Sequence, residues 1–357
     1  MKLLHVINSL GFGGAEKLIL DSIPSYEKEF NVDLLLLNGK ETLHLKKLEK
    51  KIKGKIYKLG YKSIYNPVYI FRIIPFLRKY DIIHVHLFPS LYFVAIAKIL
   101  SFSKVRLIYT EHSTHNRRRN HILFKVLDKI IYKKYHVICC ISNQVRNNLK
   151  GYLNIKELPI ITINNGVKLS DFRNVKKTIG NIPTIDNRKV ITQVSRFSIQ
   201  KDQKTLIKSI SLLPENYILF LVGEGELLEE CKSLVDELNL KKRIYFLGLR
   251  DDIPSIMNIS DIIVQSSIWE GFGLTAVEGM ASGKPVVVSN VNGLKDIVQG
   301  YGVVFEKGDS VSLSQVIKNI LEDESEYKLR SKLCLIRSEE YSIEKMVSKY
   351  IMLYNNK

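Results

Sequence analysis

The chain has 357 residues, 45% of them apolar, and this length and composition fit two globular domains and exclude a disordered or fibrous protein. Lysine and arginine number 54 against 36 aspartates and glutamates, so the formal net charge of +18 indicates an anionic partner or surface. The four cysteines form no CxxC pair, which argues against a zinc site and predicts core thiols of a reducing compartment: Cys139, Cys140, Cys231 and Cys334.

Short apolar runs alternate with amphipathic segments along the chain. The first run is too short for a signal peptide, and Pro89 and Lys98 interrupt the longest one, so no transmembrane helix is expected. Continuous Val, Ile and Leu runs are typical of parallel strands covered on both faces. The expected strands are Leu3–Ile7, Val32–Leu37, Asp81–His86, Val105–Thr110, Tyr135–Ser142, Lys189–Ser195, Tyr217–Gly223, Arg243–Gly248, Asp261–Gln265 and Pro285–Ser289. The expected crossover helices are Ala15–Ile23, Pro67–Arg78, Lys201–Leu213, Leu227–Leu238 and Thr275–Ala281.

Two histidines end the third expected strand, at the edge where open α/β sheets bind ligands. His84 and His86 point to the same face because they are two residues apart on a strand. They could line a cleft, bind a metal or be satisfied core side chains. Without a third ligand at suitable spacing the metal is the least favoured of the three, and a core role is favoured for at least one histidine.

Residues 114–136 form a basic amphipathic segment. Three consecutive arginines precede apolar residues at helical spacing, and lysines interleave with them. A second segment, residues 55–80, is rich in tyrosine and basic residues. This pattern favours docking on an anionic membrane leaflet, where each cation contributes about 1 kcal/mol. The alternative is an ordinary crossover helix with a basic solvent face.

A polar stretch at Asp171–Asn187, with Gly180 and Pro183, predicts a domain boundary. It gives an α/β chain of two Rossmann-like domains, residues 1–175 and 176–340. Residues 341–357 contain a segment with helical period, Ser342–Tyr354, and are expected to form a helix that packs back towards the N-terminal domain.

Two features of the second half indicate phosphate binding. Arg196 and Lys201 follow a strand at the predicted start of a helix, where they would add full charges to the partial charge of the helix N-terminus. Gly223, in the turn VGEGE, would let backbone approach a ligand closely. Taken singly, these features are better explained by a solvated basic turn and by an ordinary strand-to-helix turn.

The third feature is WEGFGLTAVEG, which carries Glu270 and Glu278 on either side of Gly271 and Gly273. Paired carboxylates suggest glycoside hydrolysis, but the glycines instead predict a helix start that seats an anion. Glu278, one turn into that helix, would accept hydrogen bonds from a ribose diol. The two glutamates therefore flank a phosphate site and do not face each other across a sugar bond.

This stretch resembles the EX7E motif of retaining GT-B glycosyltransferases of family 4, whose fold is two Rossmann-like domains with parallel sheets facing across a cleft. Further matches occur in order along the chain: GFGGAE at 11–16, NNGV at 164–167, VSRFSIQKD around Arg196, and MASGKPVVVS at 280–289. The resemblance implies a hexosyltransferase that uses a nucleotide-diphospho-sugar, with a UDP-sugar preferred.

The resemblance also implies roles for single residues. Arg196 and Lys201 would hold the leaving diphosphate, Glu278 the ribose, and Glu270 the donor sugar, while His112 would face that sugar as an active-site residue. No residue resembles a covalent nucleophile and no DxD motif is present, so a front-face retaining mechanism without metal or other cofactor is expected. The remaining donor-binding positions implied are Gly13, Gly14, Gly223, Gly273, Leu274 and Thr275.

The acceptor is expected to be a polyprenyl-diphosphate-linked saccharide in the assembly of capsule, O-antigen or exopolysaccharide, with the enzyme in the cytoplasm on the inner face of the plasma membrane. Three alternatives compete. A GT-B nucleotide-sugar epimerase is the nearest. A dinucleotide oxidoreductase fits poorly because Glu16 breaks the glycine pattern. A basic nucleic-acid-binding protein lacks any recognition signature, so no specific nucleic acid is expected.

Overall fold

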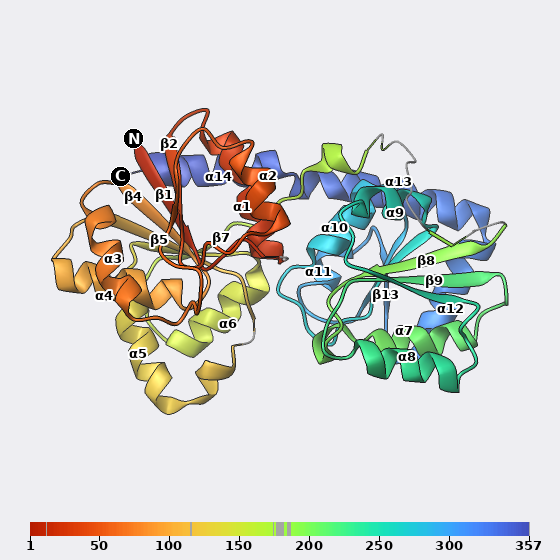
Figure 1. The fold of residues 1–357 in the computed structure, drawn as a ribbon. Helices are drawn as coiled ribbons and strands as arrows, with labels where there is room; N and C mark the ends of the chain where they lie inside the picture. Colours follow the sequence, from red (N-terminus) through yellow and green to blue (C-terminus); the bar gives the residue numbers. More distant parts are fainter. Residues whose placement is uncertain (12, 115, 174, 176–181, 184–186, 357) are drawn as a thin grey trace. The chain divides into compact units, whose positions relative to one another are not determined.

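The computed structural model describes residues 1–11, 13–114, 116–173, 175, 182–183 and 187–356 (Figure 1). The chain divides into two compact units. The N-terminal unit contains Met1–Gly166 and Ile343–Lys357, and the C-terminal unit contains Val167–Ser342.

The N-terminal unit is built on a seven-stranded parallel sheet in the order β3-β2-β1-β4-β5-β6-β7. Its strands are β1 (Lys2–Ile7), β2 (Asn31–Leu36), β3 (Ile56–Lys58), β4 (Ile82–His86), β5 (Arg106–Glu111), β6 (Val137–Cys140) and β7 (Ile160–Thr162). Its helices are α1 (Gly14–Tyr26), α2 (Leu43–Glu49), α3 (Val68–Leu77), α4 (Ser90–Ser101), α5 (Ile122–Tyr132), α6 (Asn143–Leu153) and α14 (Ile343–Asn355).

The C-terminal unit is built on a six-stranded parallel sheet in the order β10-β9-β8-β11-β12-β13. Its strands are β8 (Lys189–Val194), β9 (Tyr217–Val222), β10 (Ile244–Gly248), β11 (Ile262–Gln265), β12 (Val286–Ser289) and β13 (Val303–Phe305). Its helices are α7 (Gln203–Ser211), α8 (Leu228–Glu237), α9 (Ile253–Ile259), α10 (Leu274–Ala281), α11 (Lys295–Val298), α12 (Ser310–Glu322) and α13 (Glu324–Ser338).

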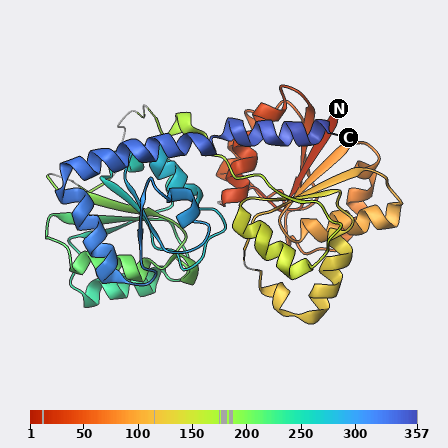
Figure 2. The same cartoon turned by 180° about the vertical axis from the view of Figure 1, so that it is seen from behind.

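The apolar runs form the central strands, as predicted. Every residue of β4, β9, β11 and β12 is buried, because helices cover both faces of each sheet (Figure 1, Figure 2). The four cysteines are buried free thiols. The α/β prediction of two Rossmann-like domains with parallel sheets is confirmed. The sequence did not predict β3, β7 and β13, because three residues are too few to form a recognisable apolar run.

The polar stretch expected to separate the domains lies partly outside the described residues, at 174, 176–181 and 184–186, and Gly180 is among these. The structural division comes earlier, after Gly166. Val167 belongs to the C-terminal unit, since its N–H donates to the Tyr341 carbonyl (2.8 Å) and it forms a parallel bridge with Ser342.

The last helix of the chain, α14, belongs to the N-terminal unit. Its Tyr354 is buried, with ring centroids 5.6 Å from Tyr26 and 5.7 Å from Phe30. The Arg106 guanidinium on β5 donates to the carbonyls of Leu353 (2.9 Å) and Tyr354 (3.1 Å), so a cation stabilises the C-terminal end of this helix.

Candidate functional site

Both sheets have the Rossmann strand order, in which the chain reverses direction across the sheet beside its first strand. In the C-terminal unit the reversal lies between β8 and β11. Ligands bind open α/β sheets beyond the carboxyl ends of the strands at such a point. The loops that follow these two strands hold Arg196 and Lys201 on one side and Glu270 on the other.

Lys201 and Glu270 come together at this point. The Lys201 ammonium forms an ion pair with the Glu270 carboxylate, and both side chains are mostly buried. The other carboxylate oxygen of Glu270 accepts from the Gly271 N–H (3.2 Å). Two residues 69 apart in the sequence therefore form one charged pair at the switch point.

The helix predicted to begin at Lys201 begins two residues later. Residues Ile199–Lys201 form a single 3-10 turn, and Asp202 (φ 44°) then reverses the backbone. The Asp202 carboxylate accepts from the Thr205 N–H (3.4 Å) and hydroxyl (2.7 Å), which makes it the N-cap of α7. Lys201 therefore lies before the helix and not in it, and its ammonium extends across the switch point to Glu270.

Buried polar side chains hold the Lys201 loop in place. The carbonyl of Lys201 accepts from the Gln193 amide (2.9 Å) and from the Ser266 hydroxyl (3.1 Å). The Gln200 amide donates to the Trp269 carbonyl (3.0 Å), and the Ile268 N–H donates to the Gln200 carbonyl (2.8 Å). These bonds join the loops after β8 and β11, and nothing in the sequence marked the residues that form them.

Arg196 lies on the same loop as Lys201 but is exposed. Its guanidinium makes no hydrogen bond or ion pair with any residue that the structure describes. Gly223 (φ 134°) follows β9 and lies against this loop, where a Cβ atom would be 2.2 Å from the Ser195 carbonyl oxygen. The glycine turn after β9 is therefore required by close backbone packing beside Arg196.

The helix that contains Glu278 begins at Leu274, one residue before the predicted range Thr275–Ala281. Its N-cap is Gly273, which has a φ of 95° and supplies no side-chain oxygen. Within the described part of the chain, the N–H groups of Leu274 and Thr275 have no hydrogen-bond acceptor, which is the arrangement found at helix ends that bind anions. Glu278 is buried within α10, with 6% of its surface exposed.

Gly293 is a residue of this region that sequence reasoning missed. It has a φ of 91°, and a Cβ atom there would be 2.6 Å from the Glu270 carbonyl oxygen. A side chain at this position would displace the Glu270 loop, so Gly293 helps to fix the carboxylate. The NG dipeptide in VNGLK predicts a turn at Gly293, but it does not indicate that this turn packs against the Glu270 loop.

In the N-terminal unit the sheet reverses between β1 and β4, and the loop after β1 leads into α1. Gly13 is the N-cap of this helix, without a side-chain hydrogen bond, and Gly14 is its first residue. Phe12, inside the predicted glycine-rich loop, lies outside the described residues. The glycines therefore leave a second helix start without a side-chain cap, at the switch point of the other sheet.

A histidine cluster fills the interior behind this point. His84 is the satisfied core histidine that was predicted, with ring nitrogens 2.6 Å from the Tyr354 hydroxyl and 2.7 Å from the Thr110 hydroxyl. His86 contacts His112 (3.2 Å) and also His5 (3.1 Å). His5, His84 and His86 each have a ring nitrogen within 4.8 Å of the others, so a third histidine does join the pair.

The sequence missed His5 because 81 residues separate it from His86, and only the pairing of β1 with β4 brings them together. Burial lowers the pKa of His5 to about 3 and that of His112 to about 4, and it lowers the pKa of His84 and His86 well below the usual value. All four imidazoles are therefore neutral at physiological pH.

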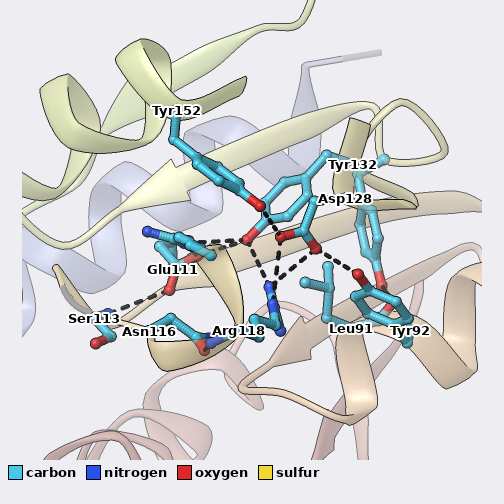
Figure 3. A network of polar contacts seen from close by, with 11 residues as sticks. Leu91, Tyr92, Glu111, Ser113, Asn116, Arg118, Asp128, Tyr132 and Tyr152 are labelled. Carbon is cyan, nitrogen blue, oxygen red and sulfur yellow. Dashed lines mark hydrogen bonds and ion pairs between the residues drawn. The ribbon is translucent and has the colours of Figure 1, made fainter. Parts of the chain in front are cut away.

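Helix α5 is oriented with polar residues inward (Figure 3). Asp128 is fully buried, where it pairs with Arg118 (3.2 Å) and accepts from the hydroxyls of Tyr92 (2.6 Å) and Tyr152 (2.9 Å). Next to this cluster, the Glu111 carboxylate binds Arg119 (2.5 Å) and the Tyr132 hydroxyl (2.7 Å), which fixes the end of β5 just before His112. These buried bonds fix which face of α5 packs on the unit.

The opposite face of α5 is apolar and exposed. Five side chains share it, with exposed fractions between 46% and 79%: Ile122, Leu123, Val126, Leu127 and Ile130. Ile131, the remaining apolar residue that the sequence places at this helical spacing, is buried. Among the described residues, the neighbouring lysines Lys125, Lys129, Lys133 and Lys134 form no ion pair through their ammonium groups. No helix in the part of the chain that the structure describes is long and apolar enough to cross a membrane.

Two family models match the chain in succession. Residues 12–171 match "Glycosyltransferase Family 4" and residues 175–333 match "Glycosyl transferases group 1". Together they account for 160 + 159 = 319 of the 357 residues.

Curated relatives have names that describe glycosyltransferases. An Escherichia coli protein named UDP-Gal:alpha-D-GlcNAc-diphosphoundecaprenol alpha-1,3-galactosyltransferase is 29% identical over 77% of this chain and 75% of its own length. A Campylobacter jejuni protein named N-acetylgalactosamine-N,N'-diacetylbacillosaminyl-diphospho-undecaprenol 4-alpha-N-acetylgalactosaminyltransferase is 26% identical over 98% of this chain and 99% of its own length.

Solved structures show the same fold. A crystal structure of Anabaena HepE in complex with UDP and glucose superposes with a TM-score of 0.87 at 21% identity, covering 100% of both chains. A crystal structure of WaaG, described as a glycosyltransferase involved in lipopolysaccharide biosynthesis, superposes with a TM-score of 0.73 at 14% identity over 99% of this chain and 100% of its own. The motifs, the paired Rossmann sheets and the two family matches agree, and the chain belongs to the GT-B glycosyltransferases of family 4.

Proposed function

We propose that this glycosyltransferase moves a hexose or N-acetylhexosamine from a nucleotide-diphospho-sugar, with a UDP-sugar preferred, to a polyprenyl-diphosphate-linked saccharide, with retention of the anomeric configuration. The observation that carries the donor half is the Lys201–Glu270 pair at the switch point of the C-terminal sheet, in which Glu270 lies a few residues before the start of α10. The acceptor half is supported by the two relatives whose names specify diphosphoundecaprenol-linked sugars.

In this proposal three positively charged groups bind the donor diphosphate. Arg196 offers an exposed guanidinium, Lys201 an ammonium, and α10 two free N–H groups at its positive end. A diphosphate that attracts Lys201 competes with Glu270 for the same ammonium. Donor binding would therefore release the Glu270 carboxylate to the hydroxyls of the sugar, while the Glu278 carboxylate accepts from the ribose.

The chemical step would use the charge that develops on the leaving diphosphate. Arg196 and Lys201 stabilise that charge in the transition state, which lowers the barrier without a covalent enzyme intermediate. Neutral His112 lies beside the donor sugar, and a diphosphate oxygen takes the proton of the acceptor hydroxyl on the same face. Because these cations neutralise the diphosphate, the reaction needs no divalent metal.

The acceptor would be reached by docking on the anionic inner face of the plasma membrane, during assembly of capsule, O-antigen or exopolysaccharide. The exposed apolar face of α5 supports this, since a large exposed apolar patch on a globular unit marks an interaction surface. Helix α4 packs against both α3 and α5 and exposes Phe102 just after its end, with 89% of that residue accessible. Unpaired lysines beside the patch favour an anionic membrane over an apolar protein partner.

Donor binding tests the proposed site directly. In a thermal-shift or calorimetric titration with UDP and a panel of nucleotide sugars, Lys201→Ala and Glu278→Ala are each expected to abolish binding of the donor that stabilises the wild type. Lys204→Ala is the matched control, because this lysine lies on α7 and pairs with Glu230 on the surface (2.7 Å). Donor affinity retained in both site variants would refute the site.

A further inference from the structure

Three histidines of the N-terminal unit form a continuous hydrogen-bonded chain. His5 Nδ1 lies 3.1 Å from His86 Nε2, and His86 Nδ1 lies 3.2 Å from His112 Nε2. They come from β1, from the end of β4 and from the residue after β5, which are neighbouring strands of the sheet. His86, in the middle, uses both ring nitrogens, so the two contacts depend on each other.

Each neutral imidazole has one N–H and one lone pair. If His112 donates from Nε2 to His86, then His86 must donate from Nε2 to His5, and His5 carries its own proton on Nε2. If the direction is reversed, all three protons lie on Nδ1. The chain therefore has two self-consistent states, and in each state all three histidines are the same tautomer.

The nitrogen atoms at the two ends of this hydrogen-bonded histidine chain are unpaired among the described residues. His5 Nε2 and His112 Nδ1 are both buried and have no hydrogen-bond partner within the described residues. Both residues line one cavity of about 20 Å³, which is enough for a single water molecule. A group bound at His112 Nδ1 therefore selects a donor or an acceptor there, and the same selection fixes the proton of His5.

We propose that His5 and His86 are positioning residues that set the tautomer of His112, and so decide whether its free Nδ1 donates or accepts a hydrogen bond. The role of His112 beside the donor sugar rests on the proposed function, whereas the tautomer chain is a property of the free protein. His84 stands outside the chain because Thr110 and Tyr354 occupy both of its ring nitrogens. For the same reason a metal at His5, His84 and His86 is disfavoured, since His84 has no nitrogen left to bind it.

The decisive experiment is two-bond ¹H–¹⁵N correlation on ¹⁵N-histidine-labelled protein at pH 7, treated with EDTA. His5, His86 and His112 are expected to be neutral and to share one tautomer, either all Nδ1–H or all Nε2–H. Different tautomers among the three histidines, or a cationic ring in any of them, would refute the proposed hydrogen-bonded chain. Signals of His5, His84 and His86 that shift together on addition of Zn²⁺ would overturn it in favour of a metal centre. This measurement needs no substrate, so its failure is distinct from failure of the proposed function.

Variants test the coupling. His5→Phe keeps an aromatic ring beside Tyr26, whose ring centroid is 5.4 Å from that of His5, and it is expected to change the tautomer populations of His112. Tyr26→Phe, the matched control in the same pocket, is expected to leave them unchanged. In the transferase assay His5→Phe should lower kcat about fivefold with little change in KM for the donor, the effect of one hydrogen bond. Identical His112 tautomers in wild type and His5→Phe would refute the coupling.

Discussion

The exposed face of α5 allows a quantitative prediction for membrane binding. Ile122 and Leu123 have 79% and 75% of their surfaces exposed, and replacing both by serine removes apolar area that the membrane would otherwise cover. Complete burial of such a side chain is worth about 1.5–3 kcal/mol. Three quarters of that for each residue gives about 2–4.5 kcal/mol for the pair. Because insertion at an interface is partial, we expect the lower value, which is about a 30-fold weaker partition coefficient.

The assay is co-sedimentation with vesicles of phosphatidylcholine and phosphatidylglycerol at low and high salt. A control variant, Leu212→Ser with Val311→Ser, removes two exposed apolar side chains of the C-terminal unit (53% and 65% exposed) and should bind like the wild type. Lys125→Gln with Lys133→Gln should weaken binding at low salt by about 2 kcal/mol and have little effect at high salt. Equal binding of wild type and Ile122→Ser/Leu123→Ser would refute the reasoning, as would a dimer that only this variant dissociates.

Three further predictions concern stability and chemistry. Asp128→Ala leaves Arg118 buried without its ion pair and should lower the free energy of unfolding, measured by urea titration, by about 3–5 kcal/mol. The control Asp171→Ala breaks an exposed pair with Lys168 and should lower it by less than about 1 kcal/mol. An equal loss of stability in both variants would contradict the buried polar network around Asp128. The pKa of each of the four clustered histidines is lowered by burial, so the unfolded state binds more protons below pH about 6.5, and stability that is complete above pH 7 should be lost as the pH falls. At pH 5 the loss of stability amounts to about 2 kcal/mol per histidine. Hydrogen exchange should then show β1, β4 and β5 opening, while the fluorescence of Trp269, which lies in the C-terminal unit that has no histidine, stays native. Simultaneous loss of exchange protection and of native Trp269 fluorescence would contradict the prediction. Transferase activity should persist in excess EDTA, and a loss that Mg²⁺ or Mn²⁺ restores would show that the cations of the donor site are insufficient.

The sequence predicted the parts of the fold that depend on local pattern. Buried parallel strands appear as uninterrupted apolar runs, and a helix start with two glutamates and spaced glycines is recognisable from the spacing of those residues. The sequence also indicated the basic amphipathic character of α5. The sequence did not predict which face of that helix is exposed, because the orientation depends on the buried contacts of Asp128. These are an ion pair with Arg118 and hydrogen bonds from the hydroxyls of Tyr92 and Tyr152.

Contacts between distant segments account for most of what the sequence missed. His5 joins His86 only because β1 pairs with β4. Gly293 reaches the Glu270 loop from a turn after β12, and Gln200 is bonded to the Trp269 carbonyl across the switch point. The early helix start predicted at Lys201 was wrong because Asp202 adopts a left-handed conformation, which residue type alone rarely reveals.

Sugar transfer to a lipid-linked acceptor is the claim on which the account of this enzyme depends, and one reaction tests it. Purified protein is incubated with a panel of UDP-sugars and a synthetic polyprenyl-diphosphate-linked N-acetylhexosamine, and the lipid product is analysed by mass spectrometry and by NMR of the new anomeric centre. We predict that one UDP-sugar adds a single hexose or N-acetylhexosamine with the anomeric configuration of the donor, and that Lys201→Ala abolishes the product while Lys204→Ala does not. A product with inverted configuration, or conversion of the nucleotide sugar without any extension of the acceptor, would contradict the account.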